Sequence, residues 1–150
     1  MRMLDKRGTA ALEFCLVAVP LFTLMFVIFD LGRYAITMQS LRALANAGAR
    51  TMMISNCYVN AEINKTPPSC TGDPLPTDAA KQAVAPFLYV GGLTPTLAIT
   101  QGAVALKACQ PTIQAATALT VTACQPSFTM LMPIWNRAFD NPSASTSVPF

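Results

Sequence analysis

The feature that most constrains this chain is an uncharged stretch near its N-terminus. Residues 14–29 form a run of sixteen residues without a charged side chain, and residues 10–12 extend the apolar segment across a single acid. At about 1.5 Å per residue, a helix over these positions is long enough to cross the roughly 30 Å hydrocarbon core of a bilayer. The sequence therefore predicts one transmembrane helix.

Charged residues before the stretch predict its orientation. Three basic residues stand there against one acid, Asp5: Arg2, Lys6 and Arg7. By the positive-inside rule, the N-terminus stays in the cytoplasm and the chain after Asp30 is exported. Two other interpretations stay open. One is a plain single-span anchor, and the other is a cleaved signal peptide, although no small-x-small cleavage site closely follows the run.

Composition excludes several classes of function. Charged residues make up 11% of the chain, whereas a typical soluble domain has about 25%. The basic residues are scattered and the net charge is only +3, which argues against a nucleic-acid partner. The chain has no histidine, so the usual general base and the commonest metal ligand are missing. We expect no enzyme, cofactor or metal site.

Proline placement divides the chain into two parts. Eleven of the twelve prolines lie at or beyond Pro67, and only Pro20 lies in the first third. Residues 1 to about 55 can therefore form a continuous helix, with a boundary near Asn56. Pro20 deprives Leu16 of its helical hydrogen-bond donor, so we expect a bend or loosening there. It is either a flexible point or a tolerated membrane proline.

Four of the five cysteines follow this boundary: Cys57, Cys70, Cys109 and Cys124. An even set in an exported region predicts two disulfides. Four cysteines allow three connectivities, and we favour the two pairs that close short loops, Cys57 with Cys70 and Cys109 with Cys124. Four reduced thiols are the alternative. Cys15 remains alone in the span.

Periodicity predicts an α+β fold after the span. Residues 34–54 continue as helix, with one polar face and one face of apolar and small residues that includes Leu41, Leu44, Gly48 and Met52. Residues 56–77 are expected to form an irregular loop, and residues 78–90 a short helix capped by Thr77. Four segments alternate in hydropathy and predict three or four antiparallel strands, the last of them at an edge: residues 96–100, 103–107, 119–124 and 143–150. Residues 128–135 form an apolar loop that either covers the core or is an exposed patch.

Glu13 needs an explanation, because a carboxylate at the start of an apolar span is costly to insert. Gly8 follows two basic residues and precedes Glu13 by five positions. A cut after Gly8 would make Thr9 a new N-terminus, whose amine could be neutralised by Glu13 of a neighbouring subunit. Alternatively, Glu13 extends to the cytoplasmic interface.

These motifs together resemble a known family. The run from Arg7 to Phe14, with Pro20, Asp30, Gly32-Arg33 and the block at residues 45–50, is similar to the TadE-like pseudopilins of tight-adherence (Flp-type) pilus machinery. The resemblance implies cleavage by a prepilin peptidase between Gly8 and Thr9. It also implies an assembly role for Glu13 and an aromatic position at Phe14.

The resemblance also implies an organisation and a function. Residues 1–8 are expected to be a leader, residues 9–55 a transmembrane and stalk helix, and residues 56–150 a periplasmic α+β domain in a pilin-like fold. The chain would be a non-enzymatic minor pilin of the inner membrane that takes part in assembling a pilus for adhesion or secretion. Its incorporation in the extracellular pilus stays open. Its partners would be the prepilin peptidase, other pilins, the assembly platform and membrane lipid. The alternative is a monomeric, membrane-anchored periplasmic binding or sensing domain.

Overall fold

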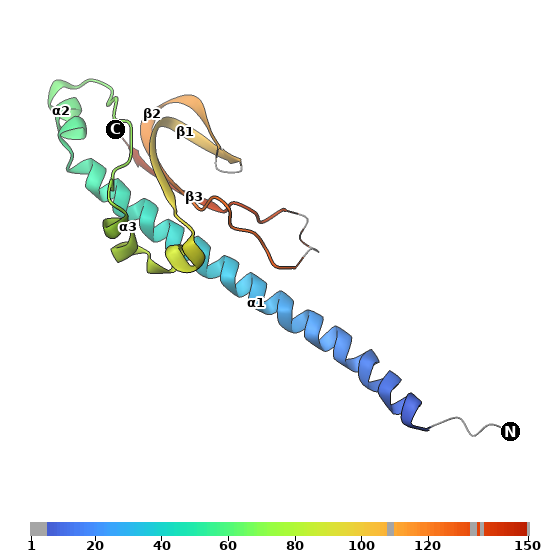
Figure 1. The fold of residues 1–150 in the computed structure, drawn as a ribbon. Coiled ribbons are helices and arrows are strands. Elements are labelled where there is room, and N and C mark those ends of the chain that lie inside the picture. Colours follow the sequence, from blue (N-terminus) through green and yellow to red (C-terminus); the bar gives the residue numbers. More distant parts are fainter. Residues whose placement is uncertain (1–5, 108–109, 133–134, 136, 150) are drawn as a thin grey trace.

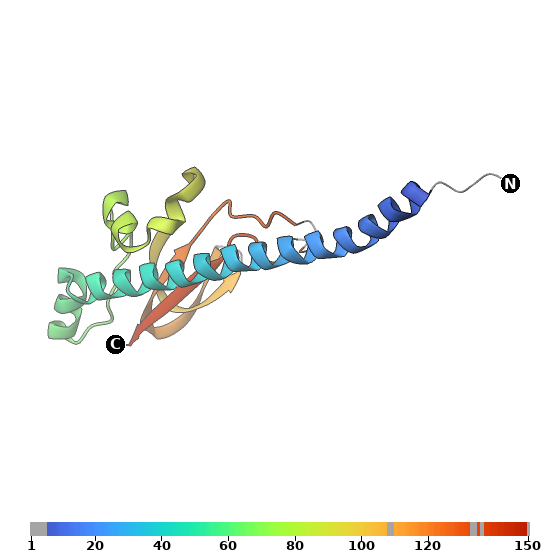
Figure 2. The ribbon, with the colours of Figure 1, turned by 90° about the horizontal axis from the view of Figure 1, so that it is seen from below.

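One long helix, α1 (Lys6–Met53), runs along the molecule and carries a small sheet on its second half (Figure 1). The computed structural model describes residues 6–107, 110–132, 135 and 137–149. The helix continues through Pro20, and Figure 2 shows that it curves along its N-terminal part. Its end at Met53 lies close to the boundary that the proline distribution predicts. A long N-terminal helix followed by an antiparallel sheet confirms the predicted α+β class.

The sheet has three antiparallel strands in the order β1-β2-β3: β1 (Thr96–Lys107), β2 (Gln110–Cys124) and β3 (Ser143–Pro149). This number agrees with the three or four strands predicted. The segments at residues 96–100 and 103–107 belong to one strand, because β1 is continuous and has only a register irregularity between Gln101 and Ala103. β3 pairs with β2 alone and forms an edge. Pro149 lies at its end, where a missing backbone donor is tolerated.

The core lies between the second half of α1 and one face of the sheet. Its largest fully buried apolar side chains are Leu41, Leu44 and Met52 from α1, with Leu119 and Val121 from β2. These α1 positions belong to the apolar helix face expected from the sequence. That face therefore packs on the chain's own sheet.

Gly48 lets the helix and the sheet approach closely. A Cβ atom added there would lie 3.0 Å from Cδ2 of Leu97, 3.1 Å from Cγ of Pro74 and 3.1 Å from Cγ1 of Val121. These distances are shorter than ordinary van der Waals contact, so a side chain at this position would require its neighbours to move by a few tenths of an ångström. Thr146 of β3 also contacts α1, because its hydroxyl donates a hydrogen bond to Oδ1 of Asn46 at 2.7 Å.

Two segments between α1 and the sheet differ from the prediction. Residues 56–77 are not one irregular loop, because α2 (Asn56–Asn64) forms before the first helix breaker at Pro67. The helix expected over residues 78–90 is split into α3 (Asp78–Val84) and the 3-10 segment η1 (Pro86–Gly92). Pro86 cannot donate to the preceding turn, so the α-helix ends there. The expected Thr77 cap is present, accepting from the backbone N–H of Ala80.

A disulfide joins Cys57 of α2 to Cys70, with 5.9 Å between the Cα atoms. Cys124 is also disulfide-bonded, but its predicted partner, Cys109, lies outside the described residues. Cys15 is a free, exposed thiol on α1. The Cys57–Cys70 disulfide links α2 to the segment just before Gly72. Gly72 forms an isolated β-bridge with Ile99 of β1, so the disulfide connects α2 to the sheet.

Candidate membrane and assembly segment

No other element of the described chain packs on the first half of α1, residues 9–29, which we call the bare half. Residues 9–29 are exposed or half-buried throughout, and the most apolar window of eighteen residues has no buried side chain. The exposed side chains are large, including Phe14, of which 70% is accessible, and Phe22 and Phe26. The helix is long and apolar enough to cross a membrane. Thr23 donates its hydroxyl to the carbonyl of Val19, so it brings no unpaired donor into lipid.

The predicted processing and assembly residues all lie on this bare half. Gly8 is within the first turns of α1, and Thr9, Glu13, Phe14 and Pro20 are exposed. Neither ion pair among the described residues involves Glu13. The structure therefore leaves the Glu13 carboxylate accessible to another molecule, but it does not bring the predicted site residues together within one chain.

The two acids of the span lie near its two ends. Glu13 and Asp30 are seventeen residues apart in one continuous helix, which corresponds to about 26 Å along the axis. That separation is close to the roughly 30 Å thickness of the hydrocarbon core. If α1 crosses a bilayer, Glu13 therefore lies near one boundary and Asp30 near the other.

Asp30 has a structural role that the sequence alone did not reveal. Its side chain is only 1% exposed. One carboxylate oxygen accepts the backbone N–H of Leu131 at 3.1 Å, and the other accepts that of Met132 at 3.0 Å. Arg33 lies 3.8 Å away on the same helix. Asp30 therefore fastens a segment about a hundred positions later in the chain to the end of the bare half. The position of an acid directly after the uncharged run was the one sequence signal for this role. It did not indicate that the backbone of Leu131 and Met132 would be the partner.

Aromatic rings surround this attachment. Phe128 is buried, with its ring centroid 6.4 Å from that of Tyr34 and 5.3 Å from the Arg33 guanidinium. The ring of Phe139 lies 5.1 Å from Tyr34 and 5.3 Å from Trp135 in edge-to-face geometry. These contacts pack the segment between β2 and β3 onto α1. The apolar loop was predicted either to cover the core or to form an exposed patch. Each alternative holds in part, because Phe128 covers the core while Leu131 is exposed.

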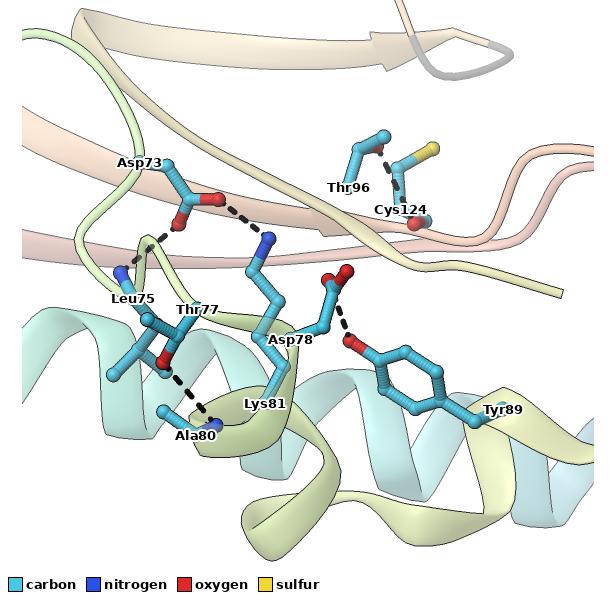
Figure 3. Close-up of polar contacts among 9 residues, drawn as sticks. All are labelled: Asp73, Leu75, Thr77, Asp78, Ala80, Lys81, Tyr89, Thr96 and Cys124. Atoms are coloured by element: carbon cyan, nitrogen blue, oxygen red, sulfur yellow. Dashed lines mark hydrogen bonds and ion pairs between the residues drawn. The ribbon is translucent and has the colours of Figure 1, made fainter.

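A second polar cluster lies between α3 and the sheet (Figure 3). The buried ammonium group of Lys81 lies 2.5 Å from Asp73, and the Tyr89 hydroxyl donates to Asp78 at 3.1 Å. Burial first, and then the Asp78 hydrogen bond and charge, raise the pKa of Tyr89 to about 12. Asp73 and Asp78 are therefore both engaged in side-chain contacts. Each carboxylate holds a structural partner, and among the described residues no group of three metal-ligating side chains occurs.

Together these observations define a class of protein: an α+β protein with a single apolar N-terminal helix that indicates membrane anchoring. Residues 8–50 match the family model described as TadE-like protein, which confirms the resemblance over α1. The match spans the bare half and most of the packed half, less than a third of the chain. No curated protein and no solved structure matches the sequence. The family match indicates involvement in Tad pilus machinery and interaction with other pilus proteins.

Proposed function

We propose that this chain is a minor pilin, or pseudopilin, of a Tad/Flp-type pilus. The observation that carries the proposal is the division of α1, whose family-matching helix is bare over its first half and packed over its second. Such a helix can sit in lipid while the protein is stored in the membrane. It can also pack against neighbouring helices in an assembly, because the same apolar surface serves both environments.

The domain boundaries follow from this proposal. Residues 1–8 are a leader that a prepilin peptidase removes between Gly8 and Thr9, residues 9–55 form the span and stalk, and residues 56–150 form the domain outside the cytoplasm. In the inner membrane the N-terminus is cytoplasmic and the domain is periplasmic. The positive charge before the span and the disulfide after it support this orientation. The protein acts through assembly rather than through catalysis.

Glu13 is the proposed assembly contact. Its carboxylate is exposed and has no partner within the ion pairs described. After cleavage, the new amine at Thr9 carries a positive charge near the same depth of the membrane. Pairing of Glu13 with the Thr9 amine of a neighbouring pilin would neutralise both charges in an apolar environment.

Processing is tested by coexpression with a prepilin peptidase and intact-mass measurement. The wild-type chain should lose its first eight residues, and Gly8→Ala should block this because the added methyl group obstructs the scissile bond. Gly32→Ala is the matched control, since a Cβ atom at Gly32 meets nothing within 4 Å. A wild-type chain that is never shortened would contradict the pilin proposal and favour a monomeric anchored domain.

Assembly is tested by crosslinking to partner pilins in membranes. Glu13→Gln keeps the shape of the side chain and removes its charge, which leaves the neighbouring amine unpaired at a cost of about 3–5 kcal/mol if the pair is buried. Crosslinking should fall while membrane insertion persists. Glu62→Gln, at an exposed acid on α2, is the control. Equal yields for wild type and Glu13→Gln, with processing intact in both, would show that Glu13 is not an assembly contact.

A further inference from the structure

The segment between β2 and β3 carries exposed apolar side chains to the end of the bare half of α1. Leu131 is 76% exposed, although its backbone N–H is held by the buried Asp30 carboxylate. Figure 1 shows this orange-red segment extending from the sheet along α1 toward the N-terminal half. A single exposed leucine is common on protein surfaces. Leu131 differs because its backbone is held at the end of the apolar half of α1.

We propose that Leu131, in the segment between β2 and β3, makes a second membrane contact and enters the headgroup region of the leaflet where the span ends. The depth of Leu131 follows from its hydrogen bond. Asp30 is the first charged residue after the sixteen uncharged ones, so it lies at the boundary of the hydrocarbon core. Its carboxylate accepts the Leu131 backbone N–H at 3.1 Å, so Leu131 lies close to the same boundary.

The occupant is lipid because the segment is attached to α1 where the apolar span ends. Ile28 and Phe29, each 59% exposed, precede Asp30 on the helix, and Leu31 follows it at 39%. The hydrogen bond to Asp30 places the exposed Leu131 at this end of the span.

The surrounding residue types fit a membrane interface. Tyr34 is half-buried, and its aromatic ring suits the headgroup level. Trp135 is also half-buried, but its indole nitrogen is buried, so this ring lies beside the contact rather than in the headgroups. Arg33 is partly exposed and Arg137 is exposed, so both guanidinium groups can reach lipid phosphates while their stems remain near the apolar boundary. This inference goes beyond pilus assembly. It rests only on α1 crossing a membrane.

The single tryptophan of the chain, Trp135, makes the proposal directly measurable. The full chain is reconstituted, one copy per disc, in nanodiscs of zwitterionic and anionic phospholipid. The lipids are brominated either near the headgroup or near the chain ends. Lipids brominated near the headgroup should quench Trp135 fluorescence several-fold more strongly than lipids brominated near the chain ends. One copy per disc excludes quenching changes caused by a second chain.

Variants separate the loop contact from the span. Leu131→Ser removes an exposed apolar side chain without opening the core, and it should at least halve the quenching. Ile63→Ser is the control, because Ile63 is an apolar side chain of the same size, 72% exposed, on α2 far from the span. This variant should leave the quenching unchanged. No quenching by either lipid would overturn the proposal. So would quenching that Leu131→Ser leaves unaltered, or quenching that appears only when two copies share a disc.

Discussion

The two halves of α1 have the same secondary structure but opposite environments. From Thr9 to Phe29 the helix presents large apolar side chains all round and buries none of them fully, whereas from Leu41 to Met52 it buries one face completely. A helix that is apolar all round is suited to lipid, and one with a single apolar face is suited to a protein core. Both halves are helical, so what distinguishes the membrane-spanning half from the half that packs on the sheet is the environment of its side chains.

Asp30 marks the transition between the two halves. Before it, no other element of the described chain covers the helix. After it, the β2–β3 segment, η1 and the sheet successively cover one face. A buried carboxylate is tolerated here because two backbone donors and Arg33 satisfy it. The change of environment is therefore specified by a polar contact as well as by hydropathy.

The largest expected effect comes from truncating one leucine in each half. Leu44 is fully buried, whereas Leu24 is 60% exposed. Leu44→Ala should destabilise the folded domain by about 2–5 kcal/mol, because it removes buried apolar surface and leaves a cavity. Leu24→Ala, the same chemical change in the same helix, should leave domain stability nearly unchanged. Denaturant unfolding of both variants in detergent micelles measures the difference. Equal losses would mean that the two halves do not differ as described.

A smaller effect is expected from adding one methyl group in each half. Gly48→Ala and Gly32→Ala gain the same helix propensity, so that contribution cancels when the two are compared. A Cβ atom at Gly48 meets three core atoms at 3.0–3.1 Å, and one at Gly32 meets nothing within 4 Å. Gly48→Ala should be less stable than Gly32→Ala by about 1–3 kcal/mol, the usual cost of overpacking. Thermal unfolding of the two variants provides the measurement, and a Gly48→Ala protein as stable as Gly32→Ala would show that the sheet can move away from α1.

Local patterns were sufficient to predict much of this fold. The uncharged run, the clustering of prolines and the alternation in the strands each depend on neighbouring residues, and they predicted α1, the sheet and the edge position of β3. The helix face that packs on the sheet followed from the spacing of Leu41, Leu44 and Met52. The resemblance to TadE-like proteins likewise rested on a contiguous stretch.

Contacts between distant residues were not predictable in the same way. The acceptor role of Asp30 depends on a loop about a hundred positions away, and the ion pair of Lys81 depends on how the segment before α3 folds back. Neither contact has a periodic signature. The helix α2 was missed for a different reason, since its polar composition resembles that of a loop until the disulfide and the buried Ala61 are known.

The smallest expected effect concerns a polar group beside the packed half. Tyr89 packs against the core and donates to Asp78, and its pKa is raised from 10.0 to about 12. The folded protein therefore keeps the phenol proton at a pH where the unfolded chain has released it. This contribution to stability is fully present below pH 10 and is lost as the pH rises toward 12.

Tyr89→Phe cannot ionise, so its stability should fall less steeply over this range than that of the wild type. Urea unfolding at successive pH values measures both slopes, and absorbance of the phenolate reports the titration itself. Because Tyr34 and Tyr58 remain in both proteins, the difference isolates Tyr89, and identical slopes would show that its hydroxyl is not held by the fold.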